Sequence, residues 1–147
     1  MAAEFEVRGD GALIRVSILG YERPDAQDYD DGNWLNATAR IAISGFRAEF
    51  PYAAYAPDLA GFLDELSALY SSMIGTASYH SLEEDFILGG RIDELGGIEW
   101  NCVAHHPHGM GAKLEFRFTS DQSHLPDLIS QLTDVLSKYP VRGLPGG

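Results

Sequence analysis

The chain has 147 residues, of which 45% are hydrophobic, and its formal net charge is −12 at pH 7. This length suits one domain with a hydrophobic core, and the ordinary apolar fraction argues against wholesale disorder. The negative charge would repel phosphates and anionic lipids, so we expect neither a nucleic-acid partner nor a membrane partner. A basic protein or a cation suits this charge better, although acidity also serves solubility alone.

The sequence shows no sign of export. No stretch approaches the roughly 20 apolar residues of a membrane helix. Glu4, Glu6 and Asp10 stand where a secretory signal would be basic. Cys102 is the single cysteine, so it has no internal disulfide partner. We therefore expect a cytoplasmic protein.

The first half of the chain predicts four strands and a helix. Strands are expected over 4–8 and 12–20 with a turn at Asp10-Gly11, and over 34–44 and 46–52 with a turn at Ser44-Gly45. An acidic loop, 23–33, separates the two pairs. Pro57 and Asp58 suit the first turn of a helix, apolar residues then recur at steps of three and four, and Gly75 ends it.

The second half predicts the same order of elements. Strand patterns cover 82–88, 91–95, 97–104 and 113–119, with Gly89-Gly90 as a turn between the first two. Pro126 and Asp127 open a second amphipathic helix, which Pro140 ends.

These elements predict an α+β fold: a curved, mostly antiparallel sheet of seven or eight strands in the order ββββαββββα, with two amphipathic helices on one face. We expect a single domain over residues 1–142 and a flexible tail over 143–147.

His105, His106 and His108 form the densest group of possible metal ligands. Neighbouring histidines on one loop rarely converge on one ion, and a site would need a further ligand brought in by the fold. We therefore predict no metal site, and metal or small-ligand binding stays an alternative role.

Two acidic segments are candidates for contact with a partner. The loop fails the register of a calcium-binding EF-hand, because Thr38 stands where the twelfth residue must be Glu. It can still offer carboxylates beside aromatic anchors, and Glu83-Glu84-Asp85 forms a second run. The predicted partner-binding residues are Asp25, Asp28, Tyr29, Asp30, Asp31, Trp34, Glu83 and Glu84.

Catalysis finds no support in the sequence. There is no Gly-x-Ser-x-Gly elbow, P-loop or dinucleotide fingerprint, and paired carboxylates such as Glu83 and Asp85 stand without a nucleophile or a second motif. We predict no catalytic residue, no cofactor and no enzymatic activity.

Several short elements resemble the WapI-type bacterial immunity proteins and related uncharacterised bacterial families. They are Asp30-Asp31 followed by Asn33-Trp34-Leu35, the segment 81–86, the alternating Phe116 and Phe118, and Tyr139-Pro140 near Arg142. The resemblance implies a cytoplasmic, non-enzymatic protein that neutralises a cognate toxin by binding it. Nuclease toxins are basic because they bind phosphates, so a basic toxin domain is the expected partner. The sequence leaves the oligomeric state open, a homodimer included.

Overall fold

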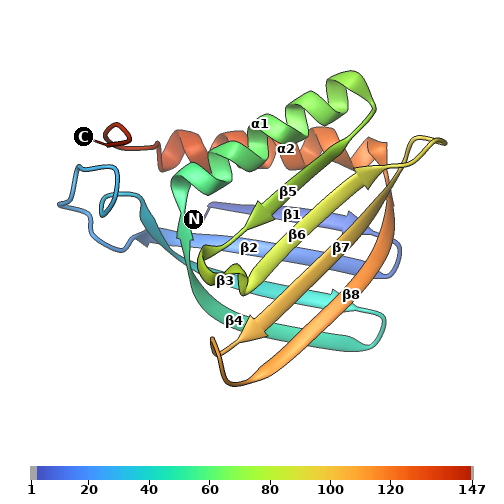
Figure 1. Cartoon of the computed structure of the whole chain (residues 1–147), viewed down its shortest axis with the longest axis horizontal. Coiled ribbons are helices and arrows are strands. Elements are labelled where there is room, and N and C mark those ends of the chain that lie inside the picture. Colours follow the sequence, from blue (N-terminus) through green and yellow to red (C-terminus); the bar gives the residue numbers. More distant parts are fainter. Residues whose placement is uncertain (1–2, 147) are drawn as a thin grey trace.

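The computed structural model describes residues 3–146. These residues form eight strands and two α-helices in the predicted order, and Figure 1 shows their arrangement. The first half holds β1 (Ala3–Gly9), β2 (Ala12–Tyr21), β3 (Trp34–Ile43), β4 (Phe46–Tyr55) and α1 (Ala56–Ser72). The second half holds β5 (Thr76–His80), a 3-10 turn η1 (Leu82–Glu84), β6 (Phe86–Ile92), β7 (Gly97–His106), β8 (Ala112–Asp121), a second 3-10 turn η2 (Gln122–His124) and α2 (Leu125–Lys138).

The strands form two antiparallel sheets of four, β1-β2-β3-β4 and β5-β6-β7-β8. The α+β class, the antiparallel pairing and the order ββββαββββα are confirmed. The sequence suggested one curved sheet, whereas the structure divides the strands after α1. The predicted turns at Asp10-Gly11 and Ser44-Gly45 close the β1–β2 and β3–β4 hairpins, and both glycines have positive φ angles.

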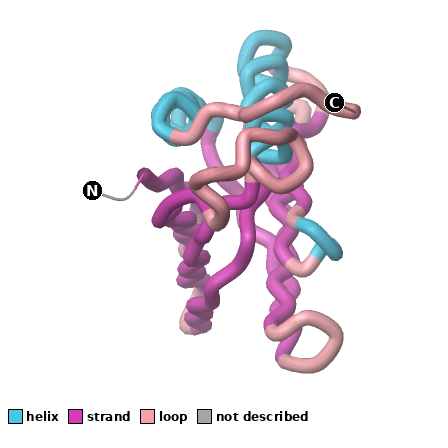
Figure 2. Tube along the Cα trace, turned by 90° about the vertical axis from the view of Figure 1, so that its left-hand side faces the viewer, coloured by secondary structure: helices cyan, strands magenta, loops and turns pink. Residues whose placement is uncertain are grey.

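The two sheets lie as separate layers whose strands cross in projection (Figure 1), and both helices lie together at one end of the layers (Figure 2). α1 packs against β5, α2 packs against β1, and the two helices pack against each other. One hydrophobic cluster draws side chains from both sheets and both helices. Among the residues described, no helix is long and apolar enough to cross a membrane.

The predicted strands at 82–88 and 91–95 each overlap the single strand β6, and the turn predicted between them was wrong. β6 runs without a break through Gly89 and Gly90, and it pairs with β5, a strand that the sequence pattern did not predict. The reason is packing: Gly90 lies opposite Trp100, and a Cβ added at Gly90 would lie 3.0 Å from the indole. Gly90 therefore makes room for an aromatic ring, and the glycine pair does not form a turn.

The sheets meet at one corner, where β1 approaches β8. The backbone N–H of Asp10 donates to the carbonyl oxygen of Thr119 over 2.9 Å, and the Ser120 hydroxyl donates to the carbonyl of Arg8. A Cβ at Gly9 would lie 2.5 Å from both Phe118 and the Thr119 oxygen, so this close approach requires glycine.

Phe62 of α1 tests how much the joint core contributes to stability. Its ring is fully buried, 5.8 Å from the Tyr79 ring and 6.4 Å from the Trp100 ring. We expect Phe62→Ala to lower the free energy of unfolding by about 3–5 kcal/mol, because a cavity forms where three elements meet. Leu95→Ala, at a side chain that is 96% exposed, should change it by less than about 0.5 kcal/mol. Urea denaturation measures both; equal effects would contradict this account of the core.

Candidate protein-binding surface

The acidic loop between β2 and β3 is held in place by the buried side chain of Asn33. Its amide nitrogen donates to the carbonyl oxygens of Tyr29 and Arg142, each over 2.9 Å. Its amide oxygen accepts from the backbone N–H of Arg142 over 2.7 Å. These polar groups would be costly to bury without hydrogen-bond partners. The Asn33 side chain supplies those partners for both the loop and the C-terminal segment and so joins the two.

Arg142 completes this contact, which we call the Asn33–Arg142 clamp. Its guanidinium donates to the carbonyl oxygens of Pro24 and Ala26 over 3.0 and 2.7 Å. The same group lies 3.5 Å from the centroid of the Tyr21 ring, a cation–π distance. The clamp holds the loop by its backbone and leaves the carboxylates outside: Asp25, Asp28, Asp30 and Asp31 are exposed.

Three half-buried aromatic rings border the loop. The Tyr55 hydroxyl donates to the carbonyl oxygen of Tyr29 over 2.8 Å, and the two rings meet edge to face at 5.9 Å. The Trp34 ring lies 4.6 Å from the Tyr55 ring. Tyr29 and Trp34 were the predicted aromatic anchors, and the structure places Tyr55 between them.

Charges connect this loop to the start of α1 and to β5. Burial raises the pKa of Tyr55, and the charges of Tyr29, Asp30, Asp58 and Asp28 raise it further. Burial also raises the pKa of Asp58, while the charge of His80 opposes that rise. Asp58 therefore lies within electrostatic reach of both the loop and β5.

The second predicted segment continues from His80. Nδ1 of His80 lies 3.7 Å from a carboxylate oxygen of Glu84. Glu83 and Glu84 both have left-handed φ angles, 63° and 58°, which are costly for residues with a side chain. Around this turn Glu83 and Asp85 face the loop between β7 and β8, while Glu84 faces His80 on β5.

Asp85 binds two of the three clustered histidines. Its carboxylate lies 2.8 Å from Nδ1 of His108 and 3.5 Å from Nδ1 of His105, while Glu83 lies 3.4 Å from Nε2 of His108. His106 points elsewhere and stacks on Phe50 at 5.5 Å. Within residues 3–146 no three His, Cys, Asp or Glu side chains are grouped so that they could hold a metal ion.

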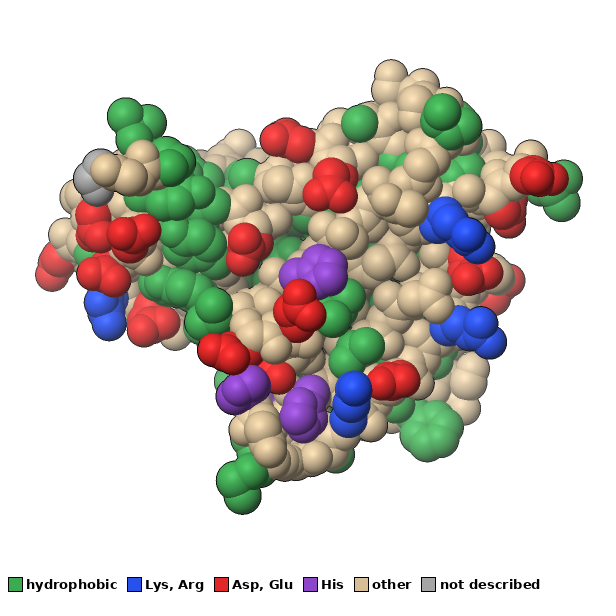
Figure 3. All heavy atoms as spheres, viewed as in Figure 1, with side chains coloured by type: hydrophobic (Ala, Val, Ile, Leu, Met, Phe, Trp, Pro, Cys, Tyr) green, Lys and Arg blue, Asp and Glu red, His purple; other side chains and the backbone are tan. Residues whose placement is uncertain are grey.

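The carboxylates of the acidic loop, of the start of α1 and of the segment 83–85 form a row that we call the acidic strip. Figure 3 shows Asp and Glu side chains extending from the acidic loop toward the histidines on the face in view. The structure thus brings the two predicted segments onto one face, and it adds residues that the sequence did not single out: Tyr55, Asp58 and His80. The strip consists of Asp25, Asp28, Asp30, Asp31, Asp58, Glu83, Glu84 and Asp85.

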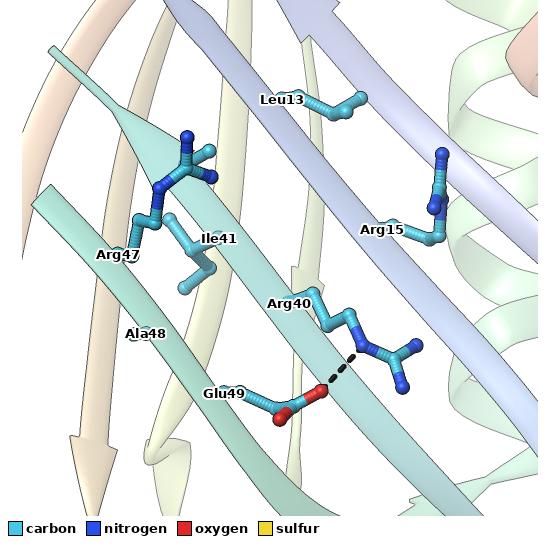
Figure 4. A pocket seen from close by; sticks show the side chains of 8 residues that line it. Leu13, Arg15, Arg40, Ile41, Arg47, Ala48 and Glu49 are labelled. Atoms are coloured by element: carbon cyan, nitrogen blue, oxygen red, sulfur yellow. Dashed lines mark hydrogen bonds and ion pairs between the residues drawn. The ribbon is translucent and has the colours of Figure 1, made fainter. Parts of the chain in front are cut away.

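A different surface gathers three of the ten Lys and Arg residues. On the outer face of β2, β3 and β4, Arg15, Arg40 and Arg47 line an open hollow of about 500 Å³ (Figure 4). Arg40 donates to Glu49, and Arg15 lies 3.6 Å from Glu6, so nearby carboxylates offset two of these charges. The hollow lies on the surface of a sheet and lacks the enclosing walls that small-molecule sites usually have.

Comparison with known proteins identifies the family. The sequence pattern of the Immunity protein WapI-like family matches residues 6–140. The chain belongs to this family. No curated protein matches the sequence. Among solved structures, the fold is similar to that reported as "Structure of the plant transcriptional regulator PBF-2", with a TM-score of 0.58 and 8% identity over 95% of this chain and 82% of that one. At this identity the likeness concerns the fold alone.

Removing the guanidinium tests the Asn33–Arg142 clamp. In Arg142→Ala we expect faster hydrogen exchange at the amides of Ala26, Asp31 and Gly32, because the loop loses two charged hydrogen bonds, worth about 1.5–3 kcal/mol each. Arg91→Ala removes an exposed arginine 4.0 Å from Glu99 and serves as the control. Unchanged exchange in the loop of Arg142→Ala would show that the guanidinium contacts of the clamp do not order it.

The contact of His108 with Asp85 predicts a pH dependence. The hydrogen bond that His108 donates to the Asp85 carboxylate is the main cause that raises the pKa of His108 above its ordinary value, about 6.5. The charged histidine is favoured, so the contact is complete below about pH 6.5 and is lost as the pH rises through the raised pKa. Titration by NMR should show a lower His108 pKa in Asp85→Asn. Glu84→Gln, which keeps Asp85, should leave it unchanged, and an equal shift in both variants would contradict the assignment.

Proposed function

We propose that this protein is a cytoplasmic immunity protein that neutralises a cognate toxin by direct binding and without enzymatic activity. Membership of the WapI-like immunity family supports the role. The acidic strip is the main support for the proposed binding surface. In the strip, exposed carboxylates from two distant segments lie on one face, beside the aromatic rings that border the loop.

The proposed partner is a basic toxin domain. Exposed carboxylates attract such a domain over long range and increase the rate of association. The proposed contact residues are Asp25, Asp28, Tyr29, Asp30, Asp31, Trp34, Glu83 and Glu84, with Tyr55 and Asp58 between the two segments. Half-buried aromatic side chains such as Trp34 commonly supply a large part of the binding energy in protein interfaces.

The alternative, a small-ligand or metal-binding protein, has weaker support. His105 and His108 are engaged with Asp85, and His106 stacks on Phe50. The arginine hollow is open and partly neutralised. We therefore favour protein binding.

Co-expression tests the role itself. The toxin domain encoded beside this gene is produced in a sensitive bacterium with and without this protein. We expect growth only when the protein is present, and a purified pair should form a complex of both chains. Unaltered toxicity with every neighbouring toxin would overturn the proposed function.

A matched pair of variants tests the acidic strip. Asp30→Asn/Glu84→Gln removes two charges within the strip, whereas Glu94→Gln/Asp134→Asn removes two exposed charges outside it. At low salt we expect the first variant to associate with the toxin about tenfold more slowly, because local steering is lost, and the second to change the rate by less than about twofold. The difference should shrink as salt screens the charges. Equal slowing by both variants would assign the effect to net charge and not to the strip.

A further inference from the structure

The free edge of β8 differs from the other sheet edges. At β1, Gln131 of α2 accepts a hydrogen bond from the N–H of Glu6 over 2.8 Å, and at β5, Glu65 of α1 accepts one from the N–H of Ser78 over 3.2 Å. β4 carries Pro51, which disfavours further pairing. Among the described residues, no backbone hydrogen bond from another element reaches 112–117 on the side of β8 away from β7.

The contact with β1 shows which backbone groups of β8 face outward. The Thr119 carbonyl points away from β7, because it accepts from Asp10. In a strand, alternate residues direct their N–H and C=O groups to the same side. Lys113, Glu115 and Arg117 therefore direct theirs to the free edge, where a further strand could bind them.

The side chains of this edge alternate in charge on one face and are apolar on the other. Lys113, Glu115 and Arg117 are exposed on the outer face of the sheet, where Lys113 lies 2.9 Å from Glu115 of the same chain, while Leu114 and Phe116 are half-buried on the inner face. A cleft of about 460 Å³ separates the start of β8 from β4 and is lined in part by Phe46, Phe50 and Leu114. Phe46 is 65% exposed, so apolar surface beside this edge is left uncovered.

An identical antiparallel strand is complementary to β8 only in certain registers. With Glu115 opposite itself, Lys113 would face Arg117 and like charges would meet at every outer position. Shifting the second strand from this register in one direction places Glu115 opposite Arg117 of the other copy. Shifting it in the other direction places Lys113 opposite Glu115 of the other copy. Each of these registers joins opposite charges twice through the two-fold symmetry.

The β1 corner selects between these two registers. The register with Glu115 opposite Arg117 would carry the second strand past Thr119, where Asp10 already occupies the edge. The register with Lys113 opposite Glu115 keeps the second strand on residues 112–116. There the outward backbone groups of Lys113 and Glu115 pair, Leu114 meets its own copy, and Phe116 lies opposite Ala112 beside the cleft.

We infer that the protein forms a symmetric dimer through β8, with Lys113 opposite Glu115 of the second copy, so that the two β5–β8 sheets join into one. This pairing is independent of toxin binding. It satisfies the free backbone groups, joins opposite charges and covers the apolar edge of the cleft in each copy. The acidic loop and the Asn33–Arg142 clamp come from other elements, so the dimer does not require them.

Charge exchange within the chain tests this dimer. Sedimentation of the full chain should show a dimer that dissociates on dilution. Lys113→Glu or Glu115→Lys alone brings like charges together twice, and we expect each to weaken the dimer by about tenfold or more. The double variant Lys113→Glu/Glu115→Lys restores opposite pairs and should return the dissociation constant to within about threefold of the original value.

The controls separate pairing from misfolding. Circular dichroism should be unchanged in all three variants. Urea midpoints should change only slightly in the single variants, which lose the exposed ion pair between Lys113 and Glu115 within the chain, because exposed pairs contribute little to stability. Arg91→Glu, on the outer face of β6, should leave the dimer intact. A chain that stays monomeric up to about 1 mM would overturn the proposal, as would a dimer indifferent to both single variants. If the double variant does not regain the original dissociation constant, the proposed register is wrong.

Discussion

The structure depends on one aromatic contact between the two sheets. The hydroxyls of Tyr52 on β4 and Tyr79 on β5 lie 3.1 Å apart, which joins the edge of one sheet to the edge of the other. Burial raises the pKa of both phenols, so both stay neutral at any physiological pH. Phe86 packs against both rings, and Phe62 of α1 packs against Tyr79. This cluster is one part of the larger core that the two sheets and both helices share.

The same cluster places the acidic strip. Tyr79 lies on β5 next to His80, and Tyr52 lies on β4 shortly before Tyr55 and the start of α1. Fixing the two phenols against each other therefore fixes Tyr55 and Asp58 relative to His80 and Glu84. The geometry of the surface proposed to bind a toxin therefore depends on the contact between Tyr52 and Tyr79 beneath it.

Much of the fold could be predicted because local chemistry decides it. Asp10-Gly11 and Ser44-Gly45 need left-handed backbone, and Pro57 suits only the start of a helix, so turns and helices were found from neighbours in sequence. β5 was missed because Thr76–His80 is short and carries little apolar pattern. Gly89-Gly90 was misjudged because its reason, Trp100, lies on another strand. The two halves of the acidic strip were visible as charge runs, but their connection through Asp58 and His80 is tertiary. The contact residues, the domain boundary at 142 and the flexibility of 143–147 stay predictions.

The Asn33–Arg142 clamp has a consequence for how the chain is made. It joins residues 109 positions apart, so the acidic loop, although it lies near the N-terminus, cannot take its final form until synthesis has reached Arg142. A chain interrupted within α2 would carry every carboxylate of the strip and lack the group that holds the loop. The order of assembly thus makes the acidic loop one of the last parts of the molecule to form, and links its shape to complete translation of the domain.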